Sequence, residues 1–271
     1  MTTQLPGMRH RIAAQSVIEE LLHQQLSMPP RTRFARFWGV SPLAADSVAW
    51  YRGAQGEIEV GRILSRLPPE WRVFHALPIG EAGADIDHLV VGPGGIFTIN
   101  TKHHRGKKIW IAERSFLVNG HRQPYLRNSK FEATRVTKIL HERMPQLPPV
   151  QAVIALVSPA SITIKKRTDE VHVLDANYLR RWLLKRPVDL AEADLVALAV
   201  IVDASTTWSP TTSAPTPNLM AQYTKLDGEF RSALVRRISW KLLSIATVTA
   251  IGVFVALPQL IALAENVTGN F

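Results

Sequence analysis

Residues 84–102, with the sequence ADIDHLVVGPGGIFTINTK, decide the fold of this chain. The pattern is typical of two apolar strands joined by a Gly/Pro turn, and side chains alternate between the two faces of a strand. Asp85 and Asp87 therefore share one face of the first strand, and Asn100 and Lys102 share one face of the second. The intervening positions are mostly apolar. A hairpin that presents carboxylates, an amide and an amine while its other positions are buried predicts a functional site.

The segments around this hairpin predict an α/β domain. Residues 47–67 are typical of a helix that ends before Pro68 and Pro69, and residues 71–77 are typical of a strand. The continuous apolar run 150–157 indicates a strand that is covered on both sides. The other predicted elements are an amphipathic helix at 8–26, strands at 108–112 and 116–118, a helix at 129–144, and weaker strands at 162–164 and 171–174 and helices at 177–185 and 191–202.

The order helix, three strands, helix, strand is that of the PD-(D/E)XK nuclease core, and the motifs resemble the nuclease-related domain called NERD. The similar pieces lie within residues 53–157 and are Gly56-Glu57, Ile86-Asp87-His88, Gly92-Pro93-x-Gly95 and Thr101-Lys102. The resemblance implies an α/β fold with a PD-(D/E)XK nuclease-like core, in which helices flank a mixed central sheet. One position departs from the pattern, because Asn100 stands where the family most often has Glu.

The resemblance also implies roles for four residues. In such nucleases the strand Asp and the Glu of the acid-x-Lys pair bind Mg²⁺ or Mn²⁺, a helix Glu assists, and the Lys orients or activates water. These roles fall to Asp87, Asn100, Glu57 and Lys102 respectively. An amide oxygen can bind Mg²⁺, but it lacks the charge of a carboxylate; Asp85, on the same strand face as Asp87, is the candidate third metal ligand.

Alternatives stay open for this site. Asp85 is also typical of a turn or surface acid, and Glu57 of a surface helix position. With Asn100 in the pattern, the sequence predicts either a metal-dependent nuclease or a catalytically silent domain that keeps the nuclease fold and binds nucleic acid or acts as a scaffold. A small-molecule enzyme is disfavoured, because no nucleotide-binding glycine motif is present.

The positive charge of the chain is concentrated after the hairpin. The formal net charge is +10, and residues 98–143 hold eleven Lys or Arg residues against three Glu. A basic segment beside a metal-type site indicates a polyanionic partner, DNA or RNA, and the alternative is a solvated surface. The candidate contacts to nucleic acid are His103, His104, Arg105, Lys107, Lys108 and Lys130. Trp110 and Tyr125 are candidates for stacking on bases, with core packing as the alternative.

A second signal lies near the C-terminal end of the sequence. Residues 242–264 form a run of 23 residues without a charge, which as a helix spans about 34 Å and matches a hydrocarbon layer of about 30 Å. The alternative is a buried core helix. Arg231, Arg236, Arg237 and Lys241 precede the run, whereas only Glu265 carries a charge after it. The positive-inside rule then predicts a single-pass protein of the cell membrane whose N-terminal domain is cytoplasmic.

The organisation predicted from these signals has five segments. Residues 8–26 mix apolar and charged residues and show no signal-peptide pattern, and the absence of cysteine excludes disulfides and thiolate zinc sites. The oligomeric state stays open. The segments are an N-terminal helix and basic connector (1–46), the nuclease-like domain with a C-terminal extension (47–203), a Ser/Thr/Pro-rich linker with a basic juxtamembrane part (204–237), the membrane helix (238–264) and a short tail (265–271).

Overall fold

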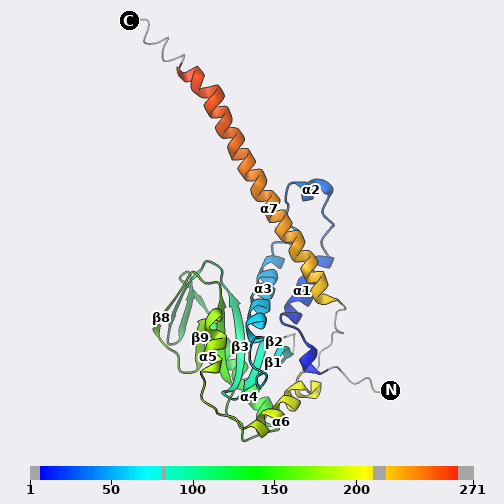
Figure 1. Ribbon diagram of the computed structural model, residues 1–271, viewed down its shortest axis with the longest axis vertical. Helices are drawn as coiled ribbons and strands as arrows, with labels where there is room; N and C mark the ends of the chain where they lie inside the picture. The colour runs from blue at the N-terminus through cyan, green and yellow to red at the C-terminus, as the bar shows by residue number, and fades with distance from the viewer. Residues whose placement is uncertain (1–6, 81–83, 210–217, 262–271) are drawn as a thin grey trace, which may run out of the picture. The chain divides into compact units, whose positions relative to one another are not determined.

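The computed structural model describes residues 7–80, 84–209 and 218–261 of the 271-residue chain (Figure 1). The described residues form two compact units. The first, called the α/β domain, lies within Met1–His23 and Asp46–Leu219. The second, called the helix unit, lies within Gln24–Ala45 and Met220–Phe271.

A five-stranded mixed sheet forms the centre of the α/β domain. Its strand order is β1-β2-β3-β7-β9; β1, β2 and β3 are antiparallel neighbours, and β7 and β9 run parallel to β3. The predicted hairpin is confirmed as β2 and β3, and the apolar run at 150–157 is the buried strand β7. The strands are β1 (Arg72–Pro78), β2 (Asp85–Gly92), β3 (Gly95–His103), β7 (Gln151–Val157) and β9 (Val171–Asp175).

A smaller sheet is formed by three strands that lie between β3 and the helix that follows it, together with one strand that follows β7. The predicted strands at 108–112 and 116–118 are present, but they pair with each other rather than with the central sheet. The strand order is β6-β5-β4-β8. Its members are β4 (Lys108–Ala112), β5 (Ser115–Val118), β6 (His121–Gln123) and β8 (Ser161–Lys166).

One face of the central sheet is covered by α3 (Ser47–Leu64) and α5 (Ala176–Leu184). Val60 and Leu64 of α3 and Leu179 and Leu183 of α5 pack with side chains of the sheet. The sheet side chains in this cluster include Val90, Phe97, Ile99, Val153 and Ala155. Burial of this apolar stripe stabilises α3 against the strands that carry the candidate site, at about 25 cal/mol for each Å² of apolar surface.

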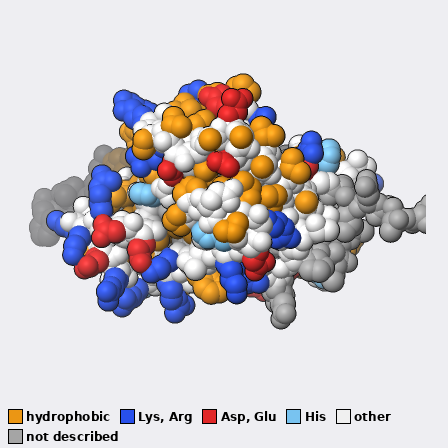
Figure 2. All heavy atoms as spheres, turned by 90° about the horizontal axis from the view of Figure 1, so that it is seen from below, with side chains coloured by type: hydrophobic (Ala, Val, Ile, Leu, Met, Phe, Trp, Pro, Cys, Tyr) orange, Lys and Arg blue, Asp and Glu red, His pale blue; other side chains and the backbone are white. Residues whose placement is uncertain are grey.

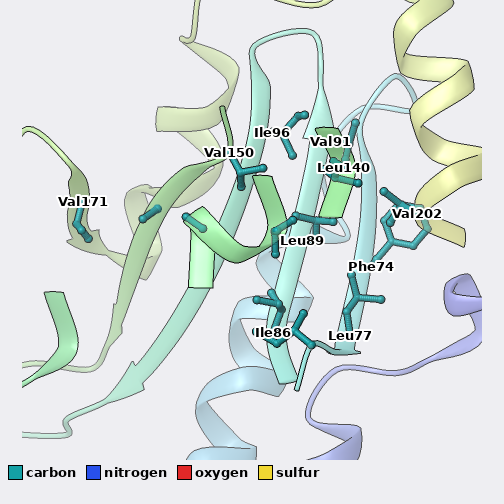
Figure 3. Close-up of a cluster of buried hydrophobic side chains, with 14 of the residues drawn as sticks. Phe74, Leu77, Ile86, Leu89, Val91, Ile96, Leu140, Val150, Val171 and Val202 are labelled. Atoms are coloured by element: carbon teal, nitrogen blue, oxygen red, sulfur yellow. The ribbon is translucent and has the colours of Figure 1, made fainter. Parts of the chain in front are cut away.

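The opposite face is covered by α4 (Tyr125–His141) and α6 (Glu192–Asp203). Figure 3 shows the cluster on this side, where Leu89 and Val91 of β2 lie with Leu140 of α4 and Val202 of α6. Leu89 and Val91 thus face away from Val90, as strand alternation requires. The mixed sheet flanked by helices confirms the predicted fold class.

The alternation is interrupted at Asp87. The pairing of β1 with β2 includes His75–His88 and Leu77–Ile86 but passes over Ala76 and Asp87. Ala76 has a φ of 48°, a left-handed conformation that costs a residue with a Cβ of the order of 1 kcal/mol. Ile86 lies four residues before Val90 and would share its side by alternation, but it packs in the cluster that contains Leu89. The distortion therefore sits at the candidate metal ligand.

The segments flanking the core differ from the expectation in detail. The predicted helix at 8–26 is split into η1 (Met8–His10) and α1 (Gln15–Leu26), with Ala14 between them at a φ of 62°. The predicted linker begins with η3 (Ser205–Thr207) and a buried Trp208, whose indole donates to the Val202 carbonyl at 2.8 Å. Its start is therefore packed rather than extended, and residues 210–217 lie outside the described ones.

The helix unit consists of α2 (Arg33–Phe37) and the long helix α7 (Leu219–Ile251), which continues through the π-helix η4 (Gly252–Ala256) to Ile261. The helix thus begins before the expected membrane segment at 238, and residues 262–264 lie outside the described range. By length and composition it could cross a membrane. Its most apolar stretch is not buried by other described residues, whereas the alternative interpretation expects a buried core helix.

Candidate functional site

The two strands of the hairpin stop pairing where the predicted acidic residues begin. Their pairing runs from Gly92–Gly95 at the turn to His88–Ile99. Beyond that point the Asp87 carboxylate accepts a hydrogen bond from the Thr101 backbone N–H, at 2.6 Å between Oδ2 and N. This bond takes the place of a backbone hydrogen bond between the two strands. It holds Asp87 against Thr101, the residue between Asn100 and Lys102.

Asn100 contacts an acidic residue that the sequence analysis missed. Its amide nitrogen lies 2.9 and 2.8 Å from the two carboxylate oxygens of Glu132 on α4. Its Oδ1 is buried and has no hydrogen-bond partner within the described part of the chain. A carboxylate thus lies next to the position where the family has one, although it comes from another element.

A signal for Glu132 was present in the sequence. It lies three residues after Ser129 and four before Val136, both of which are buried on the sheet-facing side of α4. Residues at these spacings share a helix face, so an acidic residue there is directed towards the sheet. The helix predicted at 129–144 already contains these three positions, so helical spacing alone could have placed Glu132 on the buried face.

Glu57 reaches the cluster from α3. Only 6% of it is exposed, so it is not the surface position of the alternative interpretation. A Cβ on the preceding Gly56 would lie 2.9 Å from the His103 Cβ and 3.2 Å from the Thr101 Cγ2. The glycine therefore permits α3 to approach β3 closely enough to bury Glu57 beside the strand.

Burial raises the pKa values of these carboxyl groups. The pKa of Glu57 is well above its ordinary value because of burial and then because of the negative charges of Asp87 and Asp85, while Lys102 acts in the opposite direction. The pKa of Asp87 is also raised by burial, against the opposing effects of Lys102 and the Thr101 N–H. These groups resist full ionisation together, which is the electrostatic condition that a cation relieves.

Asp85 and Glu132 belong to the same electrostatic group. Burial raises the pKa of Asp85, and the Ser16 hydroxyl and the Arg11 charge lower it. Burial also raises the pKa of Glu132, opposed by its bond with Asn100 and by the Lys102 charge. Oδ2 of Asp85 is buried and lacks a hydrogen-bond partner among the residues described. Asp85 is therefore half-buried in the cluster rather than a solvated surface acid.

Lys102 and Tyr125 form an internal pair. The Lys102 Nζ lies 5.2 Å from the centre of the Tyr125 ring, which also stacks on His104 and packs edge-on against Phe116. Tyr125 is thus engaged within the protein. Its ring orients the amine at the N-terminal end of α4, near the carboxylates whose pKa values the amine lowers.

The predicted nucleic-acid contacts divide into engaged and free side chains. His103 lies 2.9 Å from the Arg52 carbonyl through Nδ1, His104 stacks on Tyr125, and Lys130 forms an ion pair with Glu170. Three exposed residues in the turn between β3 and β4 and at the first position of β4, together called the basic turn, have no ion pair within the described ranges: Arg105, Lys107 and Lys108. Figure 2, the view from below, shows exposed hydrophobic side chains with Lys and Arg side chains around them, and it labels none of these three residues.

The donor set has the chemistry of a hard-cation site. Carboxylate and amide oxygens are the ligands that Mg²⁺ prefers, and buried oxygens of Asp85 and Asn100 have no partner within the described residues. No three His, Cys, Asp or Glu residues of the described chain form a ready metal-binding group. The residues fit a divalent cation by type and charge.

Residues 52–157 match the family model of the nuclease-related domain, NERD. The chain contains a NERD domain. The match extends from α3 to the end of β7 and includes every member of the cluster, which confirms the resemblance inferred from the motifs. Searches of the curated proteins and of the solved structures find no match to this chain.

Proposed function

We propose that the NERD domain hydrolyses phosphodiester bonds in DNA or RNA with the help of Mg²⁺ or Mn²⁺. The observation that carries this proposal is the convergence of Asp87, Asn100 and Lys102 with acids from α3 and α4 at the point where the hairpin opens. Polar groups with strongly shifted pKa values gather at functional sites more often than elsewhere. A purely structural cluster does not require three acids around one lysine.

Asp87, Asp85 and Asn100 would hold the cation, and Glu132 would balance the missing charge at position 100. When bound, the ion neutralises charge on the phosphate and lowers the pKa of water. Lys102 orients a phosphate oxygen or the attacking water through its amine. Glu57, whose pKa is raised well above its ordinary value by burial, holds a proton at its carboxyl group and can pass it on. Arg105, Lys107 and Lys108 bind backbone phosphates.

One observation favours a second function. Both oxygens of Glu132 face the Asn100 amide nitrogen, an arrangement that is satisfied without a cation. The alternative is therefore a catalytically silent domain that binds nucleic acid through the same basic turn or serves as a scaffold. Salt-dependent binding without metal-dependent cleavage would select this alternative.

We also propose that the chain is anchored in the cell membrane by α7, with the NERD domain in the cytoplasm. The support is the length and apolar composition of the helix through Ile261 and the cluster of Arg and Lys residues before residue 242. An anchor of this kind keeps the domain among intracellular nucleic acids.

The decisive experiment is a cleavage assay on the full chain in detergent, with single- and double-stranded DNA and RNA and with Mg²⁺, Mn²⁺ or a chelator. Asp87→Asn and Lys102→Met should each lower the cleavage rate by at least about 10²-fold. Glu59→Gln is the matched control, since Glu59 pairs with Arg62 on the outer side of α3. Cleavage that is unaffected by chelator or by both variants refutes the assignment.

Binding is tested on the same preparations. Replacing Lys107 and Lys108 by Gln should weaken binding to all sequences alike and reduce the salt slope by about one unit for each phosphate that the variant no longer binds. Lys166→Gln is the control in the same small sheet, because Lys166 already pairs with Glu113 at 3.0 Å. A slope unchanged by Lys107→Gln/Lys108→Gln removes the basic turn from the interface.

A further inference from the structure

The helix unit contains a short segment that is fastened to α7. The Arg236 guanidinium donates to the Arg36 carbonyl at 3.0 Å, and the Trp240 indole donates to the Phe37 carbonyl at 2.9 Å. Arg31 pairs with Glu229 at 2.6 Å. Because α2 has only five residues, it is too short to be stable alone, so these bonds hold it at a fixed position along α7.

A glycine permits this close approach. Gly39 has a φ of 72°, and a Cβ there would lie 2.6 Å from both the Ala233 carbonyl oxygen and the Arg237 nitrogen. The chain therefore turns directly on the surface of α7. Such a built contact keeps the side chains of α2 in one orientation relative to the helix.

The fastened segment exposes a cluster of aromatic rings. Phe37, Trp38 and Trp240 lie with ring centres 5.5, 4.9 and 4.7 Å apart in the three pairs, and Phe34 lies 5.9 Å from Trp38. Phe34 is 72% exposed and Phe37 is 53% exposed. Large rings left open to water are costly, so this surface is expected to meet a partner.

The location and charge of the cluster identify the partner. Trp240 stands two residues before the uncharged run that begins at Leu242. Tryptophan rings favour the boundary between headgroups and hydrocarbon, because one side is apolar and the indole N–H is polar. The cluster is also flanked by cations on α2 and α7, namely Arg33, Arg36, Arg236, Arg237 and Lys241.

We propose that residues 31–40 and Trp240 form an interfacial collar that binds the headgroups of an anionic phospholipid bilayer. The collar rests on the membrane anchor proposed above and gives it a second, lipid-selective contact. The aromatic rings insert at headgroup depth, and the arginines attract anionic headgroups. Phospholipid satisfies both the exposed rings and the excess positive charge, which an apolar protein surface would leave uncompensated.

The absence of cysteine makes a site-specific test direct. Single cysteines replace Phe34 in the collar, Ile251 in the anchor and Ala221 near the start of α7. Ala221 is the control position, because it lies about 28 Å along the helix from Trp240 at about 1.5 Å per residue. Each full-chain variant is labelled with an environment-sensitive fluorophore and reconstituted into phosphatidylcholine vesicles with or without phosphatidylglycerol. Lipids that carry a quencher at the headgroup or at the chain end report the depth.

If the collar binds lipid, the fluorophore at position 34 should be quenched by the headgroup quencher, and the quenching should increase with phosphatidylglycerol. In the double variant Arg33→Gln/Arg36→Gln, this quenching should fall to the level of the Ala221→Cys control. Arg181→Gln/Lys185→Gln, which removes two exposed cations from the α/β domain, should leave it unchanged. Chain-end quenching at position 251 reports the anchor separately. If position 251 is quenched and position 34 matches position 221, the collar is wrong and the anchor stands.

The remaining outcomes are also decisive. Quenching at position 34 but not at 251 refutes the spanning helix, and with it the collar as a contact beside that anchor. No quenching at either position refutes both. A blue-shifted but unquenched fluorophore at position 34 means that protein, such as a second copy of the chain, covers the rings, and this overturns the lipid assignment.

Discussion

Asn100 differs from an acidic residue at the same position because its amide group donates hydrogen bonds as well as accepting them. It satisfies Glu132 without a cation, and a glutamate there would place two carboxylates in contact. Like charges at this distance raise each other's pKa and destabilise the fold until a cation neutralises them. Asn100 therefore favours stability without metal, whereas a glutamate at this position would favour binding of the proposed cation.

We predict that Asn100→Glu lowers the melting temperature without metal and increases the stabilisation produced by Mg²⁺. The reason is that the added carboxylate contributes charge to the ligand set while repelling Glu132. Thermal unfolding of the full chain in detergent, over a series of Mg²⁺ concentrations, measures both effects.

The exchange variant Asn100→Glu/Glu132→Gln is the matched control. It keeps an amide-to-carboxylate hydrogen bond and the original charge, so its melting temperature without Mg²⁺ should return towards that of the parent. If Asn100→Glu shows the same Mg²⁺ response as the parent, position 100 does not face the cation.

Glu57 predicts a pH dependence of stability. Its folded-state pKa lies above the ordinary value of 4.5 because it is buried near Asp87 and Asp85. The folded chain therefore binds the proton more tightly than the unfolded chain, and stability is lost as pH rises from about 4.5 through the raised pKa. Glu57→Gln should remove this loss, so its melting temperature should gain on the parent across that window, by about 2–4 °C for each kcal/mol.

Glu59→Gln tests whether the pH dependence of stability is caused by burial of the Glu57 carboxyl group. The hydrogen bond with Arg62 lowers the pKa of Glu59, so this variant should not gain on the parent as pH rises. Mg²⁺ should reduce the advantage of Glu57→Gln, because a cation stabilises the ionised parent. Equal pH profiles for the parent and Glu57→Gln would show that Glu57 is not desolvated in solution.

At the scale of elements, periodicity predicted α3, the β2–β3 hairpin and β7 well because each has a strong apolar pattern and clear end signals. It could not predict the left-handed Ala76 opposite Asp87, since backbone strain of this kind is imposed by the surrounding sheet. It also missed that β4 and β5 form a separate sheet with β8, a pairing between segments distant in sequence.

The same contrast holds for the candidate site. Asp87, Asn100 and Lys102 follow from strand alternation and the motif resemblance, because they lie on adjacent strands of one hairpin. The contribution of Glu132 depends on the packing of α4 against β3. The engagement of His104 and Tyr125 with each other likewise depends on tertiary contacts.

We predict that Gly56→Ala destabilises the α/β domain by about 1–3 kcal/mol, the usual cost of overpacking. The new methyl group would meet the His103 Cβ at 2.9 Å and push α3 away from β3, which also displaces Glu57. Urea unfolding measures the stability and the cleavage assay measures the site.

Gly53→Ala provides the comparison on the same helix. Among the described residues, a Cβ there would meet only the Val17 Cγ1, at 3.5 Å, an ordinary contact. Because alanine favours helices over glycine, this variant should be stabilised by about 0.5–1 kcal/mol. Equal effects of the two substitutions would mean that close packing at Gly56 does not position α3.

At the scale of the whole molecule, the two units have different relations to solvent. The α/β domain buries its apolar side chains on both faces of the central sheet, whereas the apolar part of the helix that continues α7 is not buried by the described chain. Exposure of so much apolar surface in water is unfavourable, so a hydrocarbon environment is expected for this helix. Its orientation is then set by the flanking charges.

The topology prediction places the NERD domain on the cytoplasmic side, because Arg231, Arg236, Arg237 and Lys241 precede the uncharged run and only Glu265 follows it. Single cysteines at Ala191, exposed on the α/β domain, and at Gly269 can be probed in intact cells with a membrane-impermeant maleimide. Position 269 should react at once, and position 191 only after permeabilisation. The cysteine-free parent gives the background. Labelling of position 191 in intact cells would mean that the orientation is the opposite of the predicted one. Recovery of the full chain in the fraction without membranes would refute the anchor.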